Sequence, residues 1–375
     1  MTSVAAIFDH FETLTDPRID RNKRHLLHEM VVIALCAAIC GAEGWADVER
    51  FGKTKLTWFR RFLELEHGIP SHDTFGRVFA RLDTHEFLLC LQAWVQHFQS
   101  ALREQGIAID GKTLRRSFDH ATGQSALHVV SAWATDLRIC LGQVAVDEKS
   151  NEITAVPRLL QLLELSGAVV TLDAMHCQKE TAMAIRDGQA DYLLTVKGNQ
   201  QTLYQRLLDL FAEYGEQDYQ VRGLRRHTTI EKSHGREERR EYYVAPAPAD
   251  LKATWKDLQT IGMVFRQRQV GDKLHEETMF FISSLPPRVR KLAKHLRGHW
   301  GIENSLHWVL DVTFREDDSR IRKGNGPEIA SMFRKLALNI LQQDTTLKSS
   351  IRGKRLQAGW NNDVLEAILA GFNEI

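Results

Sequence analysis

The sequence predicts an α/β fold in which a mixed-sheet core is interrupted by a β-rich insertion and preceded by an N-terminal helical domain. Three observations support this prediction. The first hundred residues place apolar side chains at helical spacing, and from Gly106 onward short apolar runs typical of strands alternate with helical segments. With 375 residues, 43% hydrophobic and 26% charged, the chain can also bury a core large enough for two or more domains.

Residues 1–100 are predicted to be mostly helical. The apolar periodicity is clearest in HLLHEMVVIALCAAICG, WADVERFGKTKLTWFRRFL and SHDTFGRVFARLDTHEFLLCLQAWVQHFQSAL. Ser71 and Asp73 are suitable N-caps for the helix that carries Phe75. A basic group near the start could approach a nucleic acid, but without an identifiable recognition helix a packing or assembly role carries equal weight. The group consists of Arg18, Arg21, Lys23 and Arg24.

Strands and helices then alternate along the chain. The predicted elements are strands at Ile107–Asp110, Ala126–Ala134 and Ile139–Val146, a helix at Val156–Leu165, a strand at Ala168–Leu172, a helix at Lys179–Asp187 and a strand at Tyr192–Val196. The second and third strands are separated by a short polar segment and are predicted to form a hairpin. A hairpin followed by crossover units is the element order of a ribonuclease-H-like core.

A β-rich insertion is predicted at residues 219–285. The 130 residues between Asp173 and Glu303 are too many for a helix and a turn, and their middle contains strand-like runs at Arg239–Ala245, Leu258–Gln267 and Thr278–Ser283. The sequence thus divides into four predicted parts. These are a helical domain (1–100), the first part of the core (101–218), the insertion (219–285) and a helical completion with a C-terminal tail (286–375).

Three acids far apart in the sequence are the candidate site residues. Asp110 and Asp173 each follow an apolar run, so they can meet if the first and fourth strands of the core are neighbours, and Glu303 would come from a later helix. Clustered carboxylates need hydrogen bonds or cations to compensate them, and Mg²⁺ or Mn²⁺, here two ions, is a natural compensator. Taken singly, Asp110 is equally typical of a turn and Asp173 of a helix cap.

Longer motifs around these acids carry a family resemblance. The segments DPRIDRNKRHLLHEMVVIALCAAICG, AIDGKTLRRS, TLDAMHCQKETA, DYLLTVKGNQ, HGREERR and HWGIENSLHWVLDVTFREDDSR resemble DDE transposases of bacterial insertion sequences, particularly the H-repeat-associated proteins. The resemblance covers nearly the whole chain. It implies metal-dependent cleavage and joining of DNA, with Asp110, Asp173 and Glu303 as catalytic and metal-binding residues. It also implies double-stranded transposon ends and target DNA as partners, and a homodimer assembled on DNA.

The sequence departs from the wider superfamily around Glu303. That superfamily often has a Tyr, an Arg and a Lys near this Glu, whereas the matching positions are Leu296, His299 and Leu310. Arg297 and Lys294 could replace them as phosphate contacts.

Basic residues supply the candidate DNA contacts. The net charge is only +1, so any nucleic-acid role must rest on local groups. The candidates are Lys112, Arg115, Arg116, Lys197, Arg236, Lys294 and Arg297, with His234 and Gly235 beside Arg236. For each, the alternative is a solvated surface residue, and Lys197 could simply neutralise the acidic pocket.

Helical spacing predicts which residues near Glu303 share its face of the helix. His307 and Asp311 can share a face with Glu303 as a ligand or as hydrogen-bonding supports of the ligands. Trp300 and Trp308 are predicted to be core residues, with base stacking as the lesser alternative. The cluster Glu316, Asp317 and Asp318 is interpreted as helix-end residues or as ion-pair partners of Arg320 and Arg322, with metal binding as the alternative.

The apolar stretches and the cysteines limit the compartments in which the protein is expected. The longest apolar stretch near the start, Val31–Cys40, is too short to span a membrane, so a bacterial cytoplasmic protein without a membrane partner is expected, nucleoid-associated when bound to DNA. The five cysteines lack CxxC spacing and are expected to be reduced and packed. Two other functions remain open: a metal-dependent nuclease that does not join ends, and a catalytically silent DNA-binding protein. A glycosidase-like carboxylate pair fits the basic surroundings less well.

Overall fold

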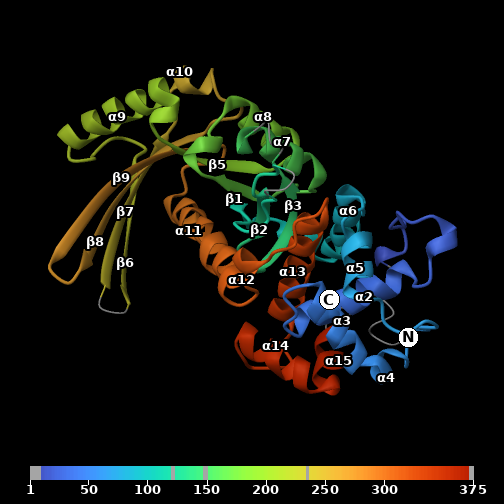
Figure 1. Ribbon diagram of the computed structural model, residues 1–375. Helices are drawn as coiled ribbons and strands as arrows, with labels where there is room; N and C mark the ends of the chain where they lie inside the picture. The colour runs from blue at the N-terminus through green and yellow to red at the C-terminus, as the bar shows by residue number, and fades with distance from the viewer. Residues whose placement is uncertain (1–9, 120–122, 147–150, 234–235, 371–375) are drawn as a thin grey trace. The chain divides into compact units, whose positions relative to one another are not determined.

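The computed structural model describes residues 10–119, 123–146, 151–233 and 236–370, and the chain within it forms two compact units (Figure 1). Unit 1 consists of Met1–Ala101, Gly111–Asn151 and Glu303–Ile375, and unit 2 of Leu102–Asp110 and Glu152–Ile302. The chain therefore passes from unit 2 to unit 1 within one strand, after Asp110, and again at Glu303.

A nine-stranded mixed sheet gives the protein its α/β class. The strand order is β3-β2-β1-β4-β5-β9-β8-β7-β6, with β1, β4 and β5 parallel and the pairs β2–β3, β5–β9, β9–β8, β8–β7 and β7–β6 antiparallel. The strands are β1 (Gly106–Thr113), β2 (His128–Ala134), β3 (Ile139–Ala145), β4 (Val169–Leu172), β5 (Asp191–Val196), β6 (Arg225–Ser233), β7 (Arg236–Pro246), β8 (Thr260–Val270) and β9 (Lys273–Ser283).

The neighbouring positions of β1 and β4 fulfil the condition under which Asp110 and Asp173 can meet. All four residues of β4 are buried, and Ile107 to Ile109 are buried in β1, as expected for strands covered on both faces. Ile109 pairs with Leu172 in the parallel register. The residue that follows each partner is an acid, so Asp110, within β1, and Asp173, directly after β4, lie side by side on adjacent strands.

Helix α11 packs against the sheet of unit 2 (Figure 1). Its apolar face joins a buried cluster that contains Val169, Leu193, Val244, Val264, Phe281, Leu292 and Leu296. The helices of unit 2 are α7 (Glu152–Leu162), α8 (Lys179–Asp187), α9 (Gln201–Glu216), α10 (Ala249–Lys252) and α11 (Val289–His299), with short 3-10 turns at Ala174–His176 and Gly198–Gln200. This packing holds the C-terminal end of α11 at a defined place above β4.

Unit 1 is mostly helical. Its α-helices are α2 (Leu27–Ile39), α3 (Trp45–Thr54), α4 (Leu56–Phe59), α5 (His72–Phe79), α6 (Thr84–Val95), α12 (Trp308–Val312), α13 (Gly326–Gln343), α14 (Ile351–Trp360) and α15 (Asn362–Ala370). Short 3-10 turns lie at Asp20–Asn22, Gln96–Leu102 and Glu316–Asp318, and a π-helical turn lies at Glu303–His307. Ser71 caps α5 as predicted, because its side chain accepts a hydrogen bond from the backbone of Thr74. The helices α2 and α13 pack against each other.

The strand-rich segment after α9 contains one strand more than the sequence predicted. The strand β6 was missed because its residues, RRHTTIEKS, include a single large aliphatic side chain, Ile230, which is exposed. As the last strand of the sheet, β6 pairs only with β7 and buries little. The outer half of β9, from Lys273 to Thr278, is likewise exposed, so its sequence shows no apolar alternation that would predict a strand.

All five cysteines are free thiols, four of them buried, as expected. Across the described ranges, no helix is both long enough and apolar enough to cross a membrane.

Candidate active site

Asp110 and Asp173 line one cavity of unit 2. Its volume is about 490 Å³, and its wall also includes Glu152, His176, Lys197 and Asn199. Lys197 and Asn199 follow β5 just as Asp173 follows β4, so the ends of three parallel strands contribute to the cavity. Both acids of the first two motifs are thus present in one solvent-accessible hollow of unit 2.

Asp173 is held by a histidine that the sequence did not single out for this role. The His299 Nε2 lies 3.3 Å from Asp173 Oδ1, and His299 Nδ1 lies 2.9 Å from the Thr171 hydroxyl. The hydrogen bond with His299 lowers the pKa of Asp173, partial burial raises it, and the nearby charge of Lys197 lowers it further. Asp173 is therefore ionised at neutral pH.

A second histidine–carboxylate pair lies on the wall of the same cavity. His176 is buried, and its Nε2 lies 3.0 Å from Glu152 Oε2 at the start of α7. Twenty-four residues separate the two in the sequence. Neither residue was a predicted site residue, because nothing in the local pattern around Glu152 distinguishes it from a surface acid.

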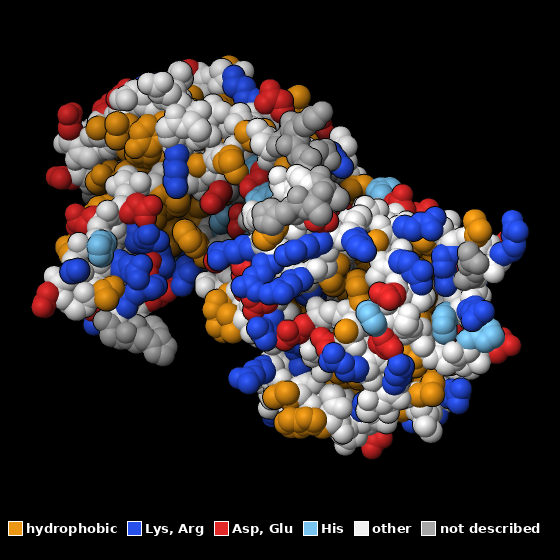
Figure 2. Space-filling model, viewed as in Figure 1, with side chains coloured by type: hydrophobic (Ala, Val, Ile, Leu, Met, Phe, Trp, Pro, Cys, Tyr) orange, Lys and Arg blue, Asp and Glu red, His pale blue; other side chains and the backbone are white. Residues whose placement is uncertain are grey.

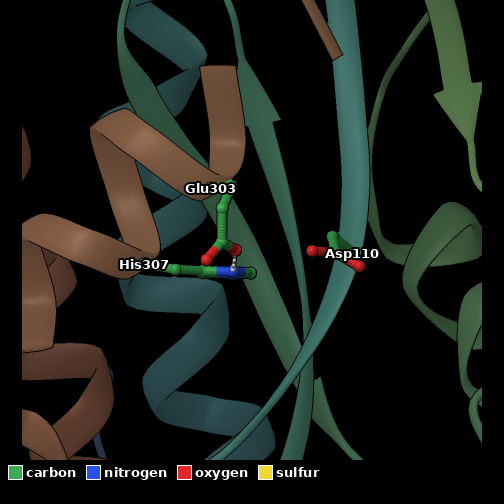
Figure 3. Close-up of side chains that lie close together, drawn as sticks. All are labelled: Asp110, Glu303 and His307. Carbon is green, nitrogen blue, oxygen red and sulfur yellow. Dashed lines mark hydrogen bonds and ion pairs between the residues drawn. The ribbon is translucent and has the colours of Figure 1, made fainter. Parts of the chain in front are cut away.

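Glu303 and His307 form a hydrogen-bonded pair in unit 1 (Figure 3). They occupy the two ends of the π-helical turn, with His307 Nδ1 3.2 Å from Glu303 Oε2, and such turns are frequent at functional sites. The Glu303 side chain is 60% exposed, whereas His307 is buried. Burial, supported by the charge of Lys335, lowers the pKa of His307 to about 4, so the ring is neutral at pH 7 and donates from Nδ1 to the carboxylate.

These residues are of the types that bind metal ions. In unit 2, Asp110 offers carboxylate oxygen atoms to an ion, and in unit 1 Glu303 and His307 offer carboxylate oxygen and imidazole nitrogen atoms. Asp110 is the last residue of its segment in unit 2, and Glu303 is the first residue of the last segment of unit 1.

Asp311 contacts Lys112 rather than the Glu303–His307 pair. The same ammonium group lies 3.3 Å from Glu316 and 3.6 Å from Asp317, and Lys112 is only 11% exposed. Burial raises the pKa of Asp311, although the hydrogen bond from Lys112 opposes this shift. Lys112 is therefore surrounded by carboxylates of its own unit.

The partners predicted for the acidic cluster Glu316–Asp318 were wrong. Instead of Arg320 and Arg322, Asp317 pairs with Arg115 at 3.2 Å and Asp318 with Arg116 at 3.4 Å. The side chains of Arg115 and Arg116 remain 80% and 49% exposed. The partners differ because the segment that follows β1 lies beside this turn, and local sequence spacing carries no information about such a contact.

Basic side chains gather over strands β6 to β8 of unit 2, interspersed with acidic ones (Figure 2). Arg236 pairs with Glu238 at 2.7 Å, and Arg297 of α11 makes two hydrogen bonds to Glu231 of β6, at 2.9 and 3.1 Å. Lys294 is exposed on the same helix, whereas His234 and Gly235 lie outside the described residues. The predicted DNA contacts on this surface are thus mostly ion-paired within the unit.

Trp300 and Trp308 were predicted to be core residues, and this prediction was wrong. Their side chains are 52% and 56% exposed. Trp300 follows the end of α11, while Leu306 and Leu310 fill the buried side of the next turns in place of Trp308. Both rings lie at the surface, so the expectation that large aromatic side chains are buried misassigned them.

Comparison with known proteins gives matches along most of the chain. Residues 101–340 match the family model described as "Transposase DDE domain", and residues 8–95 match the model described as "DDE_Tnp_1-associated". The "Putative transposase YncI" of Escherichia coli O157:H7 is 38% identical over 380 residues, which cover 100% of this chain and 96% of that protein. The "H repeat-associated putative transposase YhhI" of Escherichia coli K12 is 38% identical over 97% of this chain and 98% of its own length.

A shorter relative and a solved structure also match. The "Inactive transposase YbfQ" of Escherichia coli K12 is 39% identical over 72 residues, 19% of this chain and 86% of that protein. The structure of a piggyBac transposase synaptic complex with hairpin DNA aligns with 100% of this chain and 80% of its own, at 9% identity and a TM-score of 0.42. So low a TM-score does not establish a shared fold.

Proposed function

Because this chain belongs to the DDE transposases, in the branch of the H-repeat-associated proteins, we propose that it cuts DNA at insertion-sequence ends and joins the cut ends to target DNA. The observation that carries this proposal is the pair Asp110 and Asp173, which lie side by side on adjacent parallel strands, Asp110 within β1 and Asp173 directly after β4, in one cavity with Lys197. The carboxyl ends of parallel strands are the usual place for ligands in α/β folds.

A ribonuclease-H-like core is the proposed framework of this site. The order β3-β2-β1-β4-β5, with a hairpin at one side and parallel strands joined by helices at the other, supports it. In the same proposal, residues 219–285 are the β-rich insertion, residues 1–100 the helical N-terminal domain, and residues 286–375 the helical completion of the core and the C-terminal tail.

Asp110, Asp173 and Glu303 are proposed as ligands of two Mg²⁺ or Mn²⁺ ions. The donors fit these hard cations, because all three are carboxylates, and Asp173 is kept ionised by its neighbours. When bound, such ions lower the pKa of an attacking water and stabilise charge on the leaving oxygen of a phosphodiester. His307, neutral and buried, would orient the carboxylate of Glu303 through its Nδ1 donor.

The chain's cations supply the proposed contacts to DNA. Lys197 lies on the rim of the cavity, where its ammonium group can attract a phosphate toward the acids. Arg115 and Arg116 are exposed enough to exchange carboxylate partners for phosphates, as are Arg236, Lys294 and Arg297, whereas Lys112 is the least accessible of the predicted contacts. The proposed partners are double-stranded transposon ends and target DNA, bound by a homodimer in the bacterial cytoplasm at the nucleoid.

The test uses the purified full chain with labelled DNA that carries the ends of the insertion sequence encoding it. With Mg²⁺ or Mn²⁺ the protein is expected to give both nicked and joined products, and with EDTA neither. Asp110→Asn, Asp173→Asn and Glu303→Gln retain shape but weaken cation binding, so each is expected to lose both products while still binding DNA. Asp272→Asn, an exposed acid between β8 and β9, is the matched control and is expected to stay active.

The products distinguish the alternatives. Nicked but unjoined DNA would indicate a nuclease without joining activity. Binding without nicking under all metal conditions would indicate a catalytically silent DNA-binding protein. Magnesium-dependent cleavage that persists in Asp110→Asn or Asp173→Asn would contradict the assignment of the acids.

A further inference from the structure

The side chain of Asp173 contacts a residue of a helix that lies far away in the sequence. Asp173 follows β4 and precedes the turn Ala174–His176, but its carboxylate does not cap that turn. The side chain is 63% exposed, so packing restricts its rotamer little. The contact that orients it is with His299, at the last residue of α11.

The chemistry of the two histidine nitrogens defines the direction of that contact. An ionised carboxylate only accepts hydrogen bonds, so Nε2 of His299 must carry the proton that faces Asp173 Oδ1. In the neutral ring Nδ1 is then an acceptor, and the Thr171 hydroxyl, 2.9 Å away, donates to it. The same hydroxyl lies farther, at 3.4 Å, from the carbonyl oxygen of Ile107. Thr171 therefore selects the tautomer that binds Asp173.

The position of His299 is itself well defined. Leu292 and Leu296 on the preceding turns of α11 are buried in the core cluster with Val169 of β4. Thr171 and Asp173 lie on and directly after that same strand. The helix end and the strand end are thus parts of one packed body within unit 2.

From these contacts we infer that His299 is a positioning residue, which together with Thr171 holds the Asp173 carboxylate in the orientation that binds a divalent cation. The inference rests on the proposed function. One oxygen, Oδ1, accepts from Nε2, which leaves Oδ2 and the remaining lone pair of Oδ1 for a cation. Partners that orient a ligating side chain typically change metal affinity by about 10- to 100-fold when they are removed.

The test measures Mn²⁺ binding to the full chain without DNA, from the loss of the electron paramagnetic resonance signal of free Mn²⁺. His299→Leu is expected to raise the Kd for Mn²⁺ by about 10- to 100-fold, and His299→Gln by less, because the Gln amide can still donate. Thr171→Val, which keeps the shape but loses the hydroxyl, is expected to weaken binding, and Thr171→Ser is expected to restore it to within about twofold. His275→Leu removes an exposed histidine of the same unit and is the control for non-specific binding.

A kinetic readout separates positioning from a general structural defect. Nicking by His299→Leu is expected to need more Mn²⁺ for half-maximal rate, with much of the maximal rate recovered at saturating metal. Circular dichroism and urea unfolding identify any variant that fails to fold. If His299→Leu fails to fold, the nearly isosteric Thr171→Val still tests the inference.

The outcomes also separate this inference from the proposed function. If Asp173→Asn weakens Mn²⁺ binding while His299→Leu and Thr171→Val bind as tightly as the wild type, the positioning role is wrong and the ligand assignment stands. If Asp173→Asn itself binds Mn²⁺ like the wild type, both are wrong.

Discussion

Gly262 is predicted to be intolerant of any side chain, because the ring of Phe281 occupies the space above it. The two residues are paired across β8 and β9. A Cβ atom added to Gly262 would lie 2.0 Å from Cζ of Phe281 and 2.3 Å from Cε1, far inside van der Waals contact. Phe281 is fully buried in the cluster that also holds Leu292 of α11, so the ring cannot simply swing into solvent. Gly262→Ala is therefore expected to lower the free energy of unfolding by about 1–3 kcal/mol, toward the upper end of the range for overpacked cores.

Urea unfolding of the full chain, followed by circular dichroism and by tryptophan fluorescence, measures this loss. Phe281→Leu removes the ring atoms that collide, so the double variant Gly262→Ala/Phe281→Leu is expected to be more stable than the two single effects summed. Gly198→Ala is the matched control, since no atom lies within 4 Å of its added Cβ, and its effect should stay within about 0.5 kcal/mol. A Gly262→Ala variant that unfolds at the wild-type urea concentration, or strict additivity in the double variant, would refute the reasoning.

Three further predictions concern single interactions. Burial raises the pKa of Asp344, but hydrogen bonds, above all from Lys354, lower it overall. Asp344→Asn should therefore destabilise the protein at pH 7, and progressively less as the pH falls through the acid range. Urea unfolding measures this loss, and an effect independent of pH contradicts the prediction. Ser71→Ala removes the N-cap of α5 and should cost about 1 kcal/mol of unfolding free energy, with Ser71→Asn as the variant that retains the cap. Arg116→Gln should reduce the slope of log affinity for DNA against log salt by about 1, and an unchanged slope would mean that Arg116 contacts no phosphate.

Segments with a strong local pattern were predicted well. The helix Lys179–Asp187 has the predicted bounds, and the hairpin of β2 and β3 lies within a few residues of the expected one. The sequence left open whether β1 and β4 are neighbours, and the structure shows that they pair. Because of that pairing, Asp110 and Asp173 lie on adjacent strands.

Where few side chains are buried, the local sequence pattern gave no prediction or a wrong one. The edge strand β6 has no apolar alternation because most of its described side chains are exposed, and Trp300 and Trp308 are exposed although large aromatic residues are usually buried. Burial depends on which neighbour covers a residue. These features depend on tertiary packing and could not be predicted from local sequence patterns.

The amino-acid sequence by itself indicated the class of fold, the positions of several strands and the acids that follow their apolar runs, since the need to bury apolar side chains is written in local spacing. It also indicated that His307 can share a helix face with Glu303. Tertiary structure alone decided which side chains distant in the sequence meet: His299 with Asp173, and Arg115 with Asp317. Such contacts join segments through the register of strands and the rotamers of side chains. Those depend on how whole elements pack together, and short-range sequence patterns do not encode them.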